Sequence, residues 1–307
     1  MKKFVNVVVV VWALLVSVSA AIAAPESSFA DIQRILDTGK LRVAILATDA
    51  PPMIMTDSNG KLTGSEIDLA LHIGNKLGVD VEFVRTARTY DGVVGVVARA
   101  EADLGVSFLS SGVQRAKWVL FSQPYVTQNR RVFYNRASFT RLRRDLRIAS
   151  IAQLAETEAA ATLEFGVLAD SINEWMLQRF LPQFAVKRYD NLPDMVTDVK
   201  EGRIFGGLHG ELQIEYYMRR NPETAIHVAL EPRARLPSDI SIAVRPDAPN
   251  LLQWVNVYLA NHVGLLESDE IVERYIDCLL YTSPSPRDPL RYLVCRLLLE
   301  KRGGGGG

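Results

Sequence analysis

Cysteine is almost absent from this sequence, which has only 2 among 307 residues. Such a low count excludes a disulfide-stapled scaffold and a zinc site built from cysteines. An excess of charge of either sign is also missing, because 35 Lys and Arg residues balance 35 Asp and Glu residues. A chain without a basic excess has little that would hold a phosphate backbone, so we expect no nucleic-acid partner.

Sequence motifs of catalysis are missing as well. None of the 4 His belongs to a His-x-x-x-His pair, and neither a Gly-x-Ser-x-Gly elbow nor a phosphate loop occurs. These patterns would have indicated a metal ion, a nucleophilic serine or a bound nucleotide. We therefore predict a protein that is not an enzyme and that carries neither a cofactor nor a metal ion.

The longest apolar stretch lies at the N-terminus. A lysine pair precedes an almost wholly apolar run over residues 5–18, and Ala21-Ile-Ala23 then forms an Ala-x-Ala site. This order is typical of a secretory signal peptide, and the run is short for a membrane span. We predict a cleaved signal peptide over residues 1–23 and a periplasmic protein, with an uncleaved anchor as the alternative.

The C-terminal segment differs in composition from the rest of the chain. Residues 281–289 contain three prolines, which interrupt any helix, and residues 303–307 are all glycine. The string CLLYTSPSPRD at residues 278–288 resembles translated sequencing-adaptor read-through. We predict that residues 279–307 are a non-native or disordered tail, with a genuine flexible tail as the alternative.

Strands and helices alternate between these two ends. With 48% hydrophobic and 23% charged residues, the chain has enough apolar side chains to bury a core. Hydrophobic periodicity predicts strands at residues 41–46, 79–83 and 103–107, separated by helices at residues 67–77 and 90–100. This order predicts a parallel-rich sheet with helices on its faces.

A second alternating series follows residue 125 and predicts another α/β unit. Ser171 and Glu174 have the spacing of a capping box at the start of a helix. The expected strands lie at residues 131–134, 165–168, 186–189, 204–208, 226–230 and 240–244, and the expected helices at residues 192–201, 210–219 and 250–262.

Four short strings in a fixed order carry a family resemblance. They are GKLTGSEIDL at residues 60–69, ADLGVS at 102–107, RAK at 115–117 and FSQPY at 121–125. Together they resemble the bacterial extracellular solute-binding proteins of family 3, which include the polar-amino-acid receptors of ABC transporters. The resemblance extends over about residues 36–277.

The resemblance implies a two-lobe periplasmic-binding-protein fold of type II. Each lobe is expected to be α/β, a mixed and mostly parallel sheet flanked by helices, and the solute binds between the lobes. The expected first lobe comprises residues 36–125 and 239–277, and the second residues 130–232. The two hinge crossings fall near residues 125–130 and 233–239.

The resemblance also implies ligand-binding residues in the first lobe. Arg115 matches an arginine that binds the ligand carboxylate through two parallel hydrogen bonds, with a surface arginine as the alternative. Ser110 matches a hydroxyl that bonds the same carboxylate, and Tyr90 matches an aromatic that can stack on the ligand. Ser107 is a candidate that could equally be a structural cap, and Phe108 stands where relatives commonly have glycine.

Three further candidates lie in loops beside predicted elements. Asp49 could meet a ligand amine, although a solvated loop aspartate is the alternative. Asp170 and Ser171 precede a helix whose backbone N–H groups suit an anionic group. Ser171 could instead serve only as the N-cap of that helix.

The last candidates follow a strand of the second lobe. His209 stands where the resemblance places site residues, but the acid expected next is replaced by Gly210, and Glu211 follows one position later. In the family that acid binds the α-ammonium of the ligand. A carboxylate-bearing ligand without the amine therefore becomes credible.

These observations favour a periplasmic solute-binding protein that captures a small polar, carboxylate-bearing solute, an amino acid or a related organic acid. The expected partners are that solute and an ABC transporter permease in the inner membrane, and the protein is expected to be a monomer. One alternative is a periplasmic dehydratase or lyase on the same scaffold, which an acid–base pair such as Glu211 with His209 would favour. A sensory ligand-binding lobe is the other.

Overall fold

A computed structural model describes residues 29–232, 236–263 and 266–267. The predicted signal peptide at residues 1–23 and the predicted tail at residues 279–307 lie outside the described residues. Within the described ranges, no helix is both long and apolar enough to cross a membrane.

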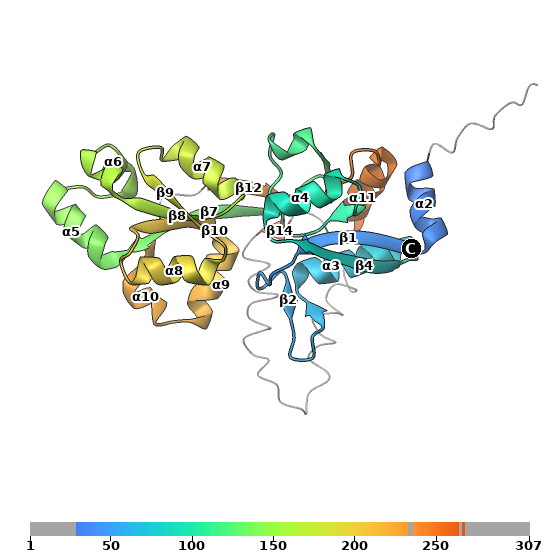
Figure 1. The fold of residues 1–307 in the computed structure, drawn as a ribbon, viewed down its shortest axis with the longest axis horizontal. Helices are drawn as coiled ribbons and strands as arrows, with labels where there is room; N and C mark the ends of the chain where they lie inside the picture. Colours follow the sequence, from blue (N-terminus) through green and yellow to red (C-terminus); the bar gives the residue numbers. More distant parts are fainter. Residues whose placement is uncertain (1–28, 233–235, 264–265, 268–307) are drawn as a thin grey trace, which may run out of the picture.

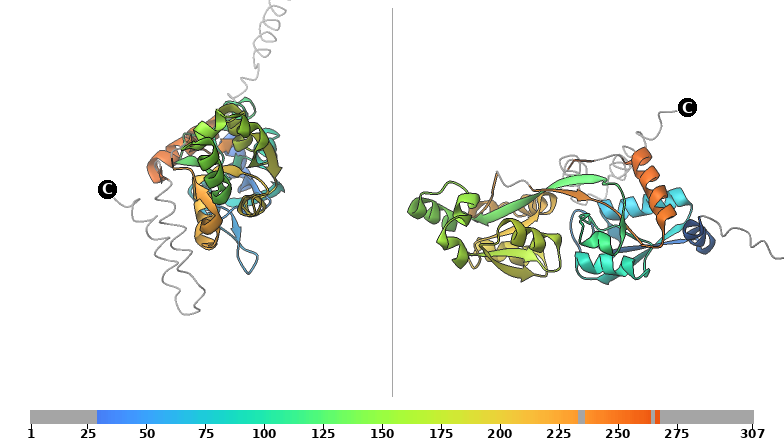
Figure 2. Two further views of the ribbon diagram at one scale, coloured as in Figure 1. Left: turned by 90° about the vertical axis from the view of Figure 1, so that its left-hand side faces the viewer. Right: turned by 90° about the horizontal axis from the view of Figure 1, so that it is seen from above.

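Two α/β lobes lie side by side along the longest axis of the molecule (Figure 1), and extended strands run between them (Figure 2). One large hydrophobic core fills the first lobe, and two smaller cores lie on the second-lobe sheet. The predicted two-lobe type II fold is confirmed.

The first lobe is built on a five-stranded mixed sheet of order β4-β1-β5-β13-β6. Strand β1 pairs in parallel with β4 and β5, whereas β13 is antiparallel to β5 and β6. The strands are β1 (Lys40–Leu46), β4 (Asp80–Ala87), β5 (Leu104–Gly105), β6 (Leu120–Phe121) and β13 (Ala243–Val244). Around them lie α2 (Ala30–Thr38), α3 (Ser65–Leu77), α4 (Tyr90–Ala98), the 3₁₀ turn η1 (Arg115–Lys117), α11 (Pro249–His262) and the hairpin β2 (Met55–Thr56) and β3 (Leu62–Thr63).

Local sequence signals account for the bounds of the first-lobe helices. Helix α3 ends at Gly78, whose φ of 73° places it in the left-handed conformation that glycine adopts without strain. Helix α4 begins after Thr89, whose side chain accepts a hydrogen bond from the Gly92 N–H. The predicted helices here are confirmed, and α4 places Tyr90 at its first position.

The second lobe has a sheet of order β11-β7-β10-β8-β9. Strand β8 is parallel to β9 and β10, and β7 is antiparallel to β10 and β11. The strands are β7 (Val126–Asn135), β8 (Glu164–Leu168), β9 (Ala185–Tyr189), β10 (Gly206–Gly210) and β11 (Val228–Leu230). The helices are α5 (Arg136–Leu146), α6 (Ile151–Ala155), η2 (Glu158–Thr162), α7 (Ile172–Phe180), α8 (Leu192–Lys200), α9 (Glu211–Arg220) and α10 (Thr224–His227).

The lobes are joined by β7 and by β12 (Leu236–Ile240), which pair antiparallel from Arg130 opposite Leu236 to Val126 opposite Ile240. Strand β14 (Leu266–Glu267) runs parallel to the start of β7. The single strand expected at residues 240–244 is wrong, since β12 ends at Ile240 and β13 begins at Ala243. The interruption has a physical reason: the chain stops pairing with β7 and starts pairing with β5 and β6 of the first lobe.

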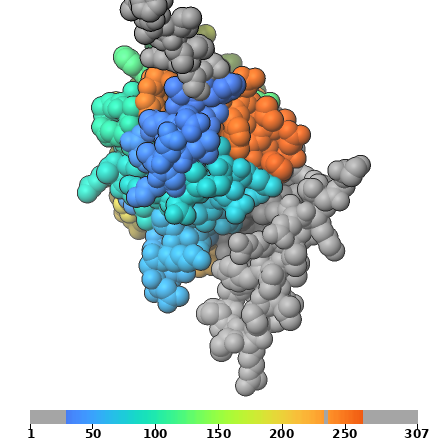
Figure 3. Space-filling model, turned by 90° about the vertical axis from the view of Figure 1, so that its right-hand side faces the viewer, coloured from blue at the N-terminus to red at the C-terminus, as the bar shows by residue number. Residues whose placement is uncertain are grey.

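Segments distant in the sequence complete the first lobe. Helices α2 and α11 lie side by side on its outer surface (Figure 3). The carboxylate of Asp31 in α2 accepts hydrogen bonds from the backbone N–H groups of Asn250 and Leu251, at 2.9 and 3.1 Å, at the start of α11. A negative charge there satisfies two free donors and complements the helix dipole.

Candidate functional site

The two lobes touch each other in this structure. The backbone N–H of Asp91 in α4 donates to the carbonyl of Asp170, before α7, at 3.2 Å. A Cβ built on Gly112 would lie 3.5 Å from Cδ1 of Ile172 in α7. We call the region enclosed by these contacts and by β7 the lobe junction; most of the predicted site residues lie on the segments around it.

Arg115 lies in η1 and is only 5% exposed, so the alternative of a surface arginine is excluded. Its Nε donates to Oδ1 of Asp91 at 2.7 Å, and its Nη1 donates to the carbonyl of Ser110 at 3.0 Å. The buried Nη2 has no hydrogen-bond partner among the described residues. A buried guanidinium that is held at two nitrogens and unpaired at the third is suited to bind an anionic ligand.

Arg130, on the crossing strand β7, is a second buried arginine and one that sequence reasoning missed. Its Nη2 donates to the hydroxyl of Ser110 and, at 3.1 Å, to the hydroxyl of Ser238 in β12, while Nε has no partner among the described residues. Burial lowers the pKa of Arg130 to about 10, and the charge of Arg115 acts in the same direction. Thus the junction holds two neighbouring cations.

The alternation of β7 explains why Arg130 faces the junction. Gln128 and Arg130 are buried, whereas Asn129 and Arg131 are only half-buried, as expected for residues that point to opposite faces of a strand. The Oε1 of Gln128 is buried without a partner among the described residues. The sequence therefore contained a signal for Arg130: two polar residues, Gln128 and Arg130, lie two positions apart at the predicted hinge, so they point to the same face of a strand.

Tyr90 lies close to both junction arginines. Burial raises the pKa of its hydroxyl, while the charges of Arg130 and Arg115 and the side chain of Gln213 in α9 lower it. The hydroxyl is therefore near cations from the first lobe and from the crossing strand. Its predicted role of stacking on a ligand stays a prediction.

Ser107 and Phe108 have structural contacts within the first lobe. The Ser107 hydroxyl accepts a hydrogen bond from the Leu46 N–H at 3.1 Å, as the structural alternative predicts. Phe108 has a φ of 53°, a left-handed conformation that is strained for a bulky residue, and its ring is part of the first-lobe core. Glycine adopts this conformation without strain, which explains why relatives commonly have glycine at the position.

Glu66, at the start of α3, supports the backbone of Phe108. Its Oε2 accepts hydrogen bonds from the Phe108 N–H at 2.7 Å and from the Tyr125 hydroxyl at 2.6 Å. Burial raises the pKa of Glu66 to about 7, although both hydrogen bonds lower it. The carboxyl thus links α3, the loop after β5 and the entrance to the hinge strand.

Asp49 is held within its own loop. Its carboxylate accepts from the N–H and the hydroxyl of Thr56 at 2.8 and 2.9 Å, and it forms an ion pair with Arg85 at 3.1 Å. These contacts fix the segment around β2 to β4. The predicted contact with a ligand amine stays a prediction, and the carboxylate already has a cationic partner.

The capping box predicted at the start of α7 is wrong. The Ser171 hydroxyl donates to the Leu168 carbonyl at 2.6 Å and makes no side-chain cap of the helix. Asp170 has a φ of 46° and an exposed side chain. This left-handed residue turns the chain so that its carbonyl, not its carboxylate, meets the first lobe at Asp91.

His209 and Glu211 flank Gly210 at the end of β10. His209 is 3% exposed, and burial, reinforced by the charge of Arg130, lowers its pKa to about 3, so the imidazole is neutral at ordinary pH. Strand register pairs His209 with Arg131. Glu211 forms an ion pair with Arg131 at 2.5 Å and accepts from Asn129 Nδ2 at 3.2 Å, so its carboxylate is already engaged.

Two glutamine side chains pack closely against Gly210. A Cβ built on Gly210 would collide with Oε1 of Gln213 and lie 2.8 Å from Oε1 of Gln128. Any side chain there would displace these two amides, and both amide oxygens are buried without partners among the described residues. The acid at position 211 instead pairs with Arg131.

Two other features of the described residues, groups of metal-ligand side chains and a surface hollow, give no site for a ligand. No group of three or more His, Cys, Asp or Glu in them could hold a metal ion. A hollow of ≈ 400 Å³ lies on the second lobe beside β9 and α8. Its central acid, Asp198, already accepts hydrogen bonds from Lys187, Tyr189 and Arg203.

Two binding proteins of Escherichia coli are similar to this chain in sequence. The chain is 24% identical over 223 residues to ABC transporter arginine-binding protein 1 of Escherichia coli (strain K12), covering 72% of this chain and 84% of that one. It is 24% identical over 236 residues to the L-cystine-binding protein TcyJ of the same strain, covering 76% and 82%.

A solved structure of an ancestral amino acid-binding protein, described as a precursor of cyclohexadienyl dehydratase, aligns with a TM-score of 0.65 and 26% identity. The alignment covers 80% of this chain and 99% of that one. Residues 41–277 match the family model of the bacterial extracellular solute-binding proteins, family 3, which is more than half of the chain. The chain therefore belongs to the bacterial extracellular solute-binding proteins, family 3.

Proposed function

We propose that this protein is a periplasmic binding protein that captures a small carboxylate-bearing solute and delivers it to an ABC permease in the inner membrane. The observation that carries the proposal is Arg115, a buried guanidinium at the junction of two lobes with an unpaired Nη2. A small ligand held between two lobes can contact both and stabilise the closed state.

The ligand class follows from the site and is supported by the relatives. By name, the two Escherichia coli relatives bind arginine and cystine, both of which carry carboxylates. The unpaired Nη2 of Arg115 can donate to a carboxylate, and the interaction is strengthened where water is excluded. An amino acid or a related organic acid is therefore the expected cargo.

The domain organisation belongs to the same proposal. Residues 36–125 and 239–277 are assigned to the first lobe and residues 130–232 to the second. Residues 1–23 are assigned to an export signal. A domain hinged at β7 and β12 closes on its ligand, and a periplasmic location suits capture from outside the inner membrane. The monomer presents its bound solute to the permease.

The dehydratase connection of the ancestral relative does not extend to a catalytic assignment here. An acid–base pair of Glu211 and His209 would require a free carboxylate. Glu211 is bound by Arg131 and Asn129, and His209 is buried. This pair therefore gives no basis for a catalytic proposal, and we propose a binding role.

A thermal-shift screen of amino acids and small organic acids tests the proposal. A ligand present at 100 times its Kd stabilises the folded state by about 2.7 kcal/mol, which raises the melting temperature measurably. At least one carboxylate compound should stabilise the protein, and Arg115→Ala should abolish the shift. The matched control is Arg99→Ala, an exposed arginine paired with Glu101, which should keep the shift. A screen without any stabilising compound would contradict the proposal.

A further inference from the structure

We propose that Arg115 and Arg130 form a two-cation site and that the solute is a dicarboxylate whose recognition requires no ammonium group. This inference rests on the proposed solute-binding function and narrows the ligand class. It depends on the juxtaposition of two buried guanidiniums, one in the first lobe and one on the crossing strand.

Both arginines converge on Ser110. Arg115 donates to its carbonyl at 3.0 Å, and Arg130 donates to its hydroxyl. Two guanidiniums that share one residue are close enough for their charges to repel, and each is only 5% exposed. Half-exposed Asp91 already pairs with Arg115, whereas no carboxylate of the described residues pairs with Arg130. A ligand with two negatively charged groups would neutralise Arg130 and also bind the unpaired Nη2 of Arg115.

The contacts of Arg130 do not fit a purely structural role. Its partners are the hydroxyls of Ser110 and Ser238, and no carboxylate of the described residues forms an ion pair with it. A buried charge without a counter-charge destabilises the folded protein. By contrast, Arg131, the next residue, pairs with Glu211 at 2.5 Å. The cost at Arg130 is offset when an anion binds.

Each of three carboxylates around the junction already has a donor. Glu211 is bound by Arg131 and Asn129, and Glu66 accepts from Tyr125 and a backbone N–H. Asp91 is half-exposed and holds Arg115 at 2.7 Å. An amine on the ligand would have to share a carboxylate with one of these donors, so we expect it to add little affinity.

Neutral polar groups supply the remaining contacts. The amide oxygens of Gln128 and Gln213 are buried without partners among the described residues, and either amide turned by 180° would present its N–H₂ group instead. Such groups can bond a carboxylate oxygen or a hydroxyl. They are compatible with a plain or a hydroxylated dicarboxylate.

A matched series of probes separates these features of the ligand. Succinate, malate and L-aspartate share a four-carbon dicarboxylate and carry a hydrogen, a hydroxyl or an ammonium group, and butyrate retains one carboxylate. Calorimetric titration of each into the wild-type protein should give succinate or malate at least tenfold tighter binding than butyrate. L-Aspartate should bind no more tightly than succinate.

Variants then assign each cation. Arg130→Met should weaken succinate binding at least tenfold and change butyrate binding less than threefold, because Arg130 binds the second carboxylate. Arg115→Ala should weaken both ligands. Arg130→Lys retains the charge but loses the planar fork and should lie between wild type and Arg130→Met. If Arg130→Met fails to fold, Arg130→Lys still tests the role of Arg130. Arg99→Ala is the control and should bind all ligands as the wild-type protein does.

Three results would overturn the inference. The first is that succinate, malate and butyrate all fail to bind, or that all three bind with the same affinity. The second is that L-aspartate binds at least tenfold more tightly than succinate, because the protein must then have a site for the ammonium group. The third is that both Arg130 variants bind succinate with the affinity of the wild-type protein. If L-arginine or another monocarboxylate amino acid binds in an Arg115-dependent manner, the solute-binding function stands while the dicarboxylate inference fails.

Discussion

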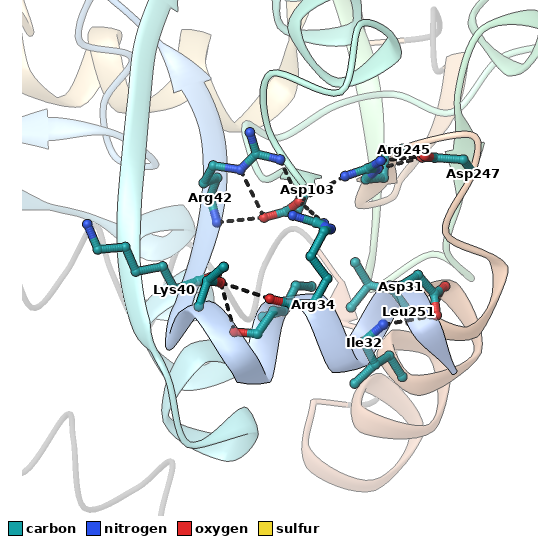
Figure 4. Close-up of polar contacts among 11 residues, drawn as sticks. Asp31, Ile32, Arg34, Lys40, Arg42, Asp103, Arg245, Asp247 and Leu251 are labelled. Atoms are coloured by element: carbon teal, nitrogen blue, oxygen red, sulfur yellow. Dashed lines mark hydrogen bonds and ion pairs between the residues drawn. The ribbon is translucent and has the colours of Figure 1, made fainter. Parts of the chain in front are cut away.

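The protein contains two clusters of arginines that differ in how their charge is balanced. In the outer part of the first lobe, Arg34, Arg42 and Arg245 surround Asp103 (Figure 4). At the lobe junction, Arg115 and Arg130 surround a serine. The first cluster contains a fully buried carboxylate, whereas the second contains buried nitrogens without partners among the described residues.

The Asp103 cluster has the geometry of a structural element. Asp103 Oδ1 contacts Arg34 at 2.6 Å and Arg42 at 2.9 Å, and Oδ2 accepts from the Arg42 backbone N–H at 3.0 Å. Burial alone would raise the pKa of Asp103, but the hydrogen bonds from Arg42 and Arg34 outweigh it and lower the pKa. The cluster ties α2 and β1 to β5.

At the junction, Asp91 pairs with Arg115, but no carboxylate of the described residues pairs with Arg130. This difference is the reason why we propose that the junction cluster binds an anion. Buried polar groups are nearly always hydrogen-bonded in folded proteins. An unpaired buried group lowers stability, and such groups are expected at functional sites. We therefore expect arginine to be structural around Asp103 and functional at the lobe junction. Substitutions in both clusters, and at titratable groups outside them, test this account.

Asp103→Asn should have the largest effect. The change removes the negative charge and leaves Arg34, Arg42 and Arg245 around a neutral amide. Breaking a buried ion pair from one side costs about 3–5 kcal/mol, so the free energy of unfolding in urea should fall by that amount. Asp247→Asn, at a 60% exposed partner of Arg245, should cost less than about 1 kcal/mol. Equal effects would contradict a structural role for Asp103.

Glu66 should make stability depend on pH. Its pKa is about 7 in the folded protein against 4.5 ordinarily, so between these values the folded protein holds a proton that the unfolded chain has released. This contribution is full below pH 4.5 and is lost as pH rises towards 7, by roughly 3 kcal/mol. Because Glu66→Gln cannot titrate, its stability relative to wild type should rise over that range.

His209 should change the pH dependence of stability in the opposite direction, and it provides the control for the Glu66 measurement. Its pKa falls from 6.5 to about 3 in the folded protein, so the unfolded chain binds the proton first and stability is lost as pH falls below 6.5. His209→Gln should remove that loss. If Glu66→Gln and wild type keep a constant stability difference between pH 4.5 and 7, Glu66 is ionised in the fold at low pH and this account of it is wrong.

Arg115→Ala should weaken binding of the solute found by screening at least tenfold. A charge-assisted contact contributes about 1.5–3 kcal/mol, and about 1.4 kcal/mol corresponds to one decade of affinity. Arg115→Lys should also bind more weakly, because an ammonium lacks the planar set of donors that contacts Asp91 and Ser110 and still leaves Nη2 for the ligand. Calorimetry measures both variants. Unchanged affinity in Arg115→Ala would remove Arg115 from the site.

Asp49→Asn should have the smallest effect. The ion pair of Asp49 with Arg85 is partly exposed, and exposed pairs contribute about 0–1 kcal/mol. The melting temperature should fall slightly, and solute affinity should stay within twofold of wild type. A tenfold loss of affinity, measured by the same titration, would show that Asp49 contacts the ligand.

Local patterns in the sequence predicted most of the fold. Glycine at position 78 and threonine at position 89 terminate and begin helices for reasons that a few neighbouring residues contain. The break between β12 and β13 was not predictable, because the apolar run over residues 240–244 is continuous while its pairing partners change. The Ser171 cap failed because the Leu168 carbonyl competed for the hydroxyl.

The candidate site was only partly visible for a similar reason. Arg115 was found through its motif, whereas Arg130 lies in no motif and acquires its role from strand alternation beside Ser110 and Ser238. Glu211 looked like a free acid in the sequence. Only the register of β7 beside β10, with α9 starting at Glu211, brings it to Arg131.

The most direct test compares the unfolding free energies of Arg130→Met and Arg42→Met in the absence of added solute. Arg42→Met should lower stability by roughly 2 kcal/mol, since it removes part of the counter-charge of buried Asp103. Arg130→Met should leave stability unchanged or raise it, because it removes a buried charge without a carboxylate partner among the described residues. A loss in Arg130→Met as large as that in Arg42→Met would show that Arg130 is structural and would contradict the distinction between the two clusters.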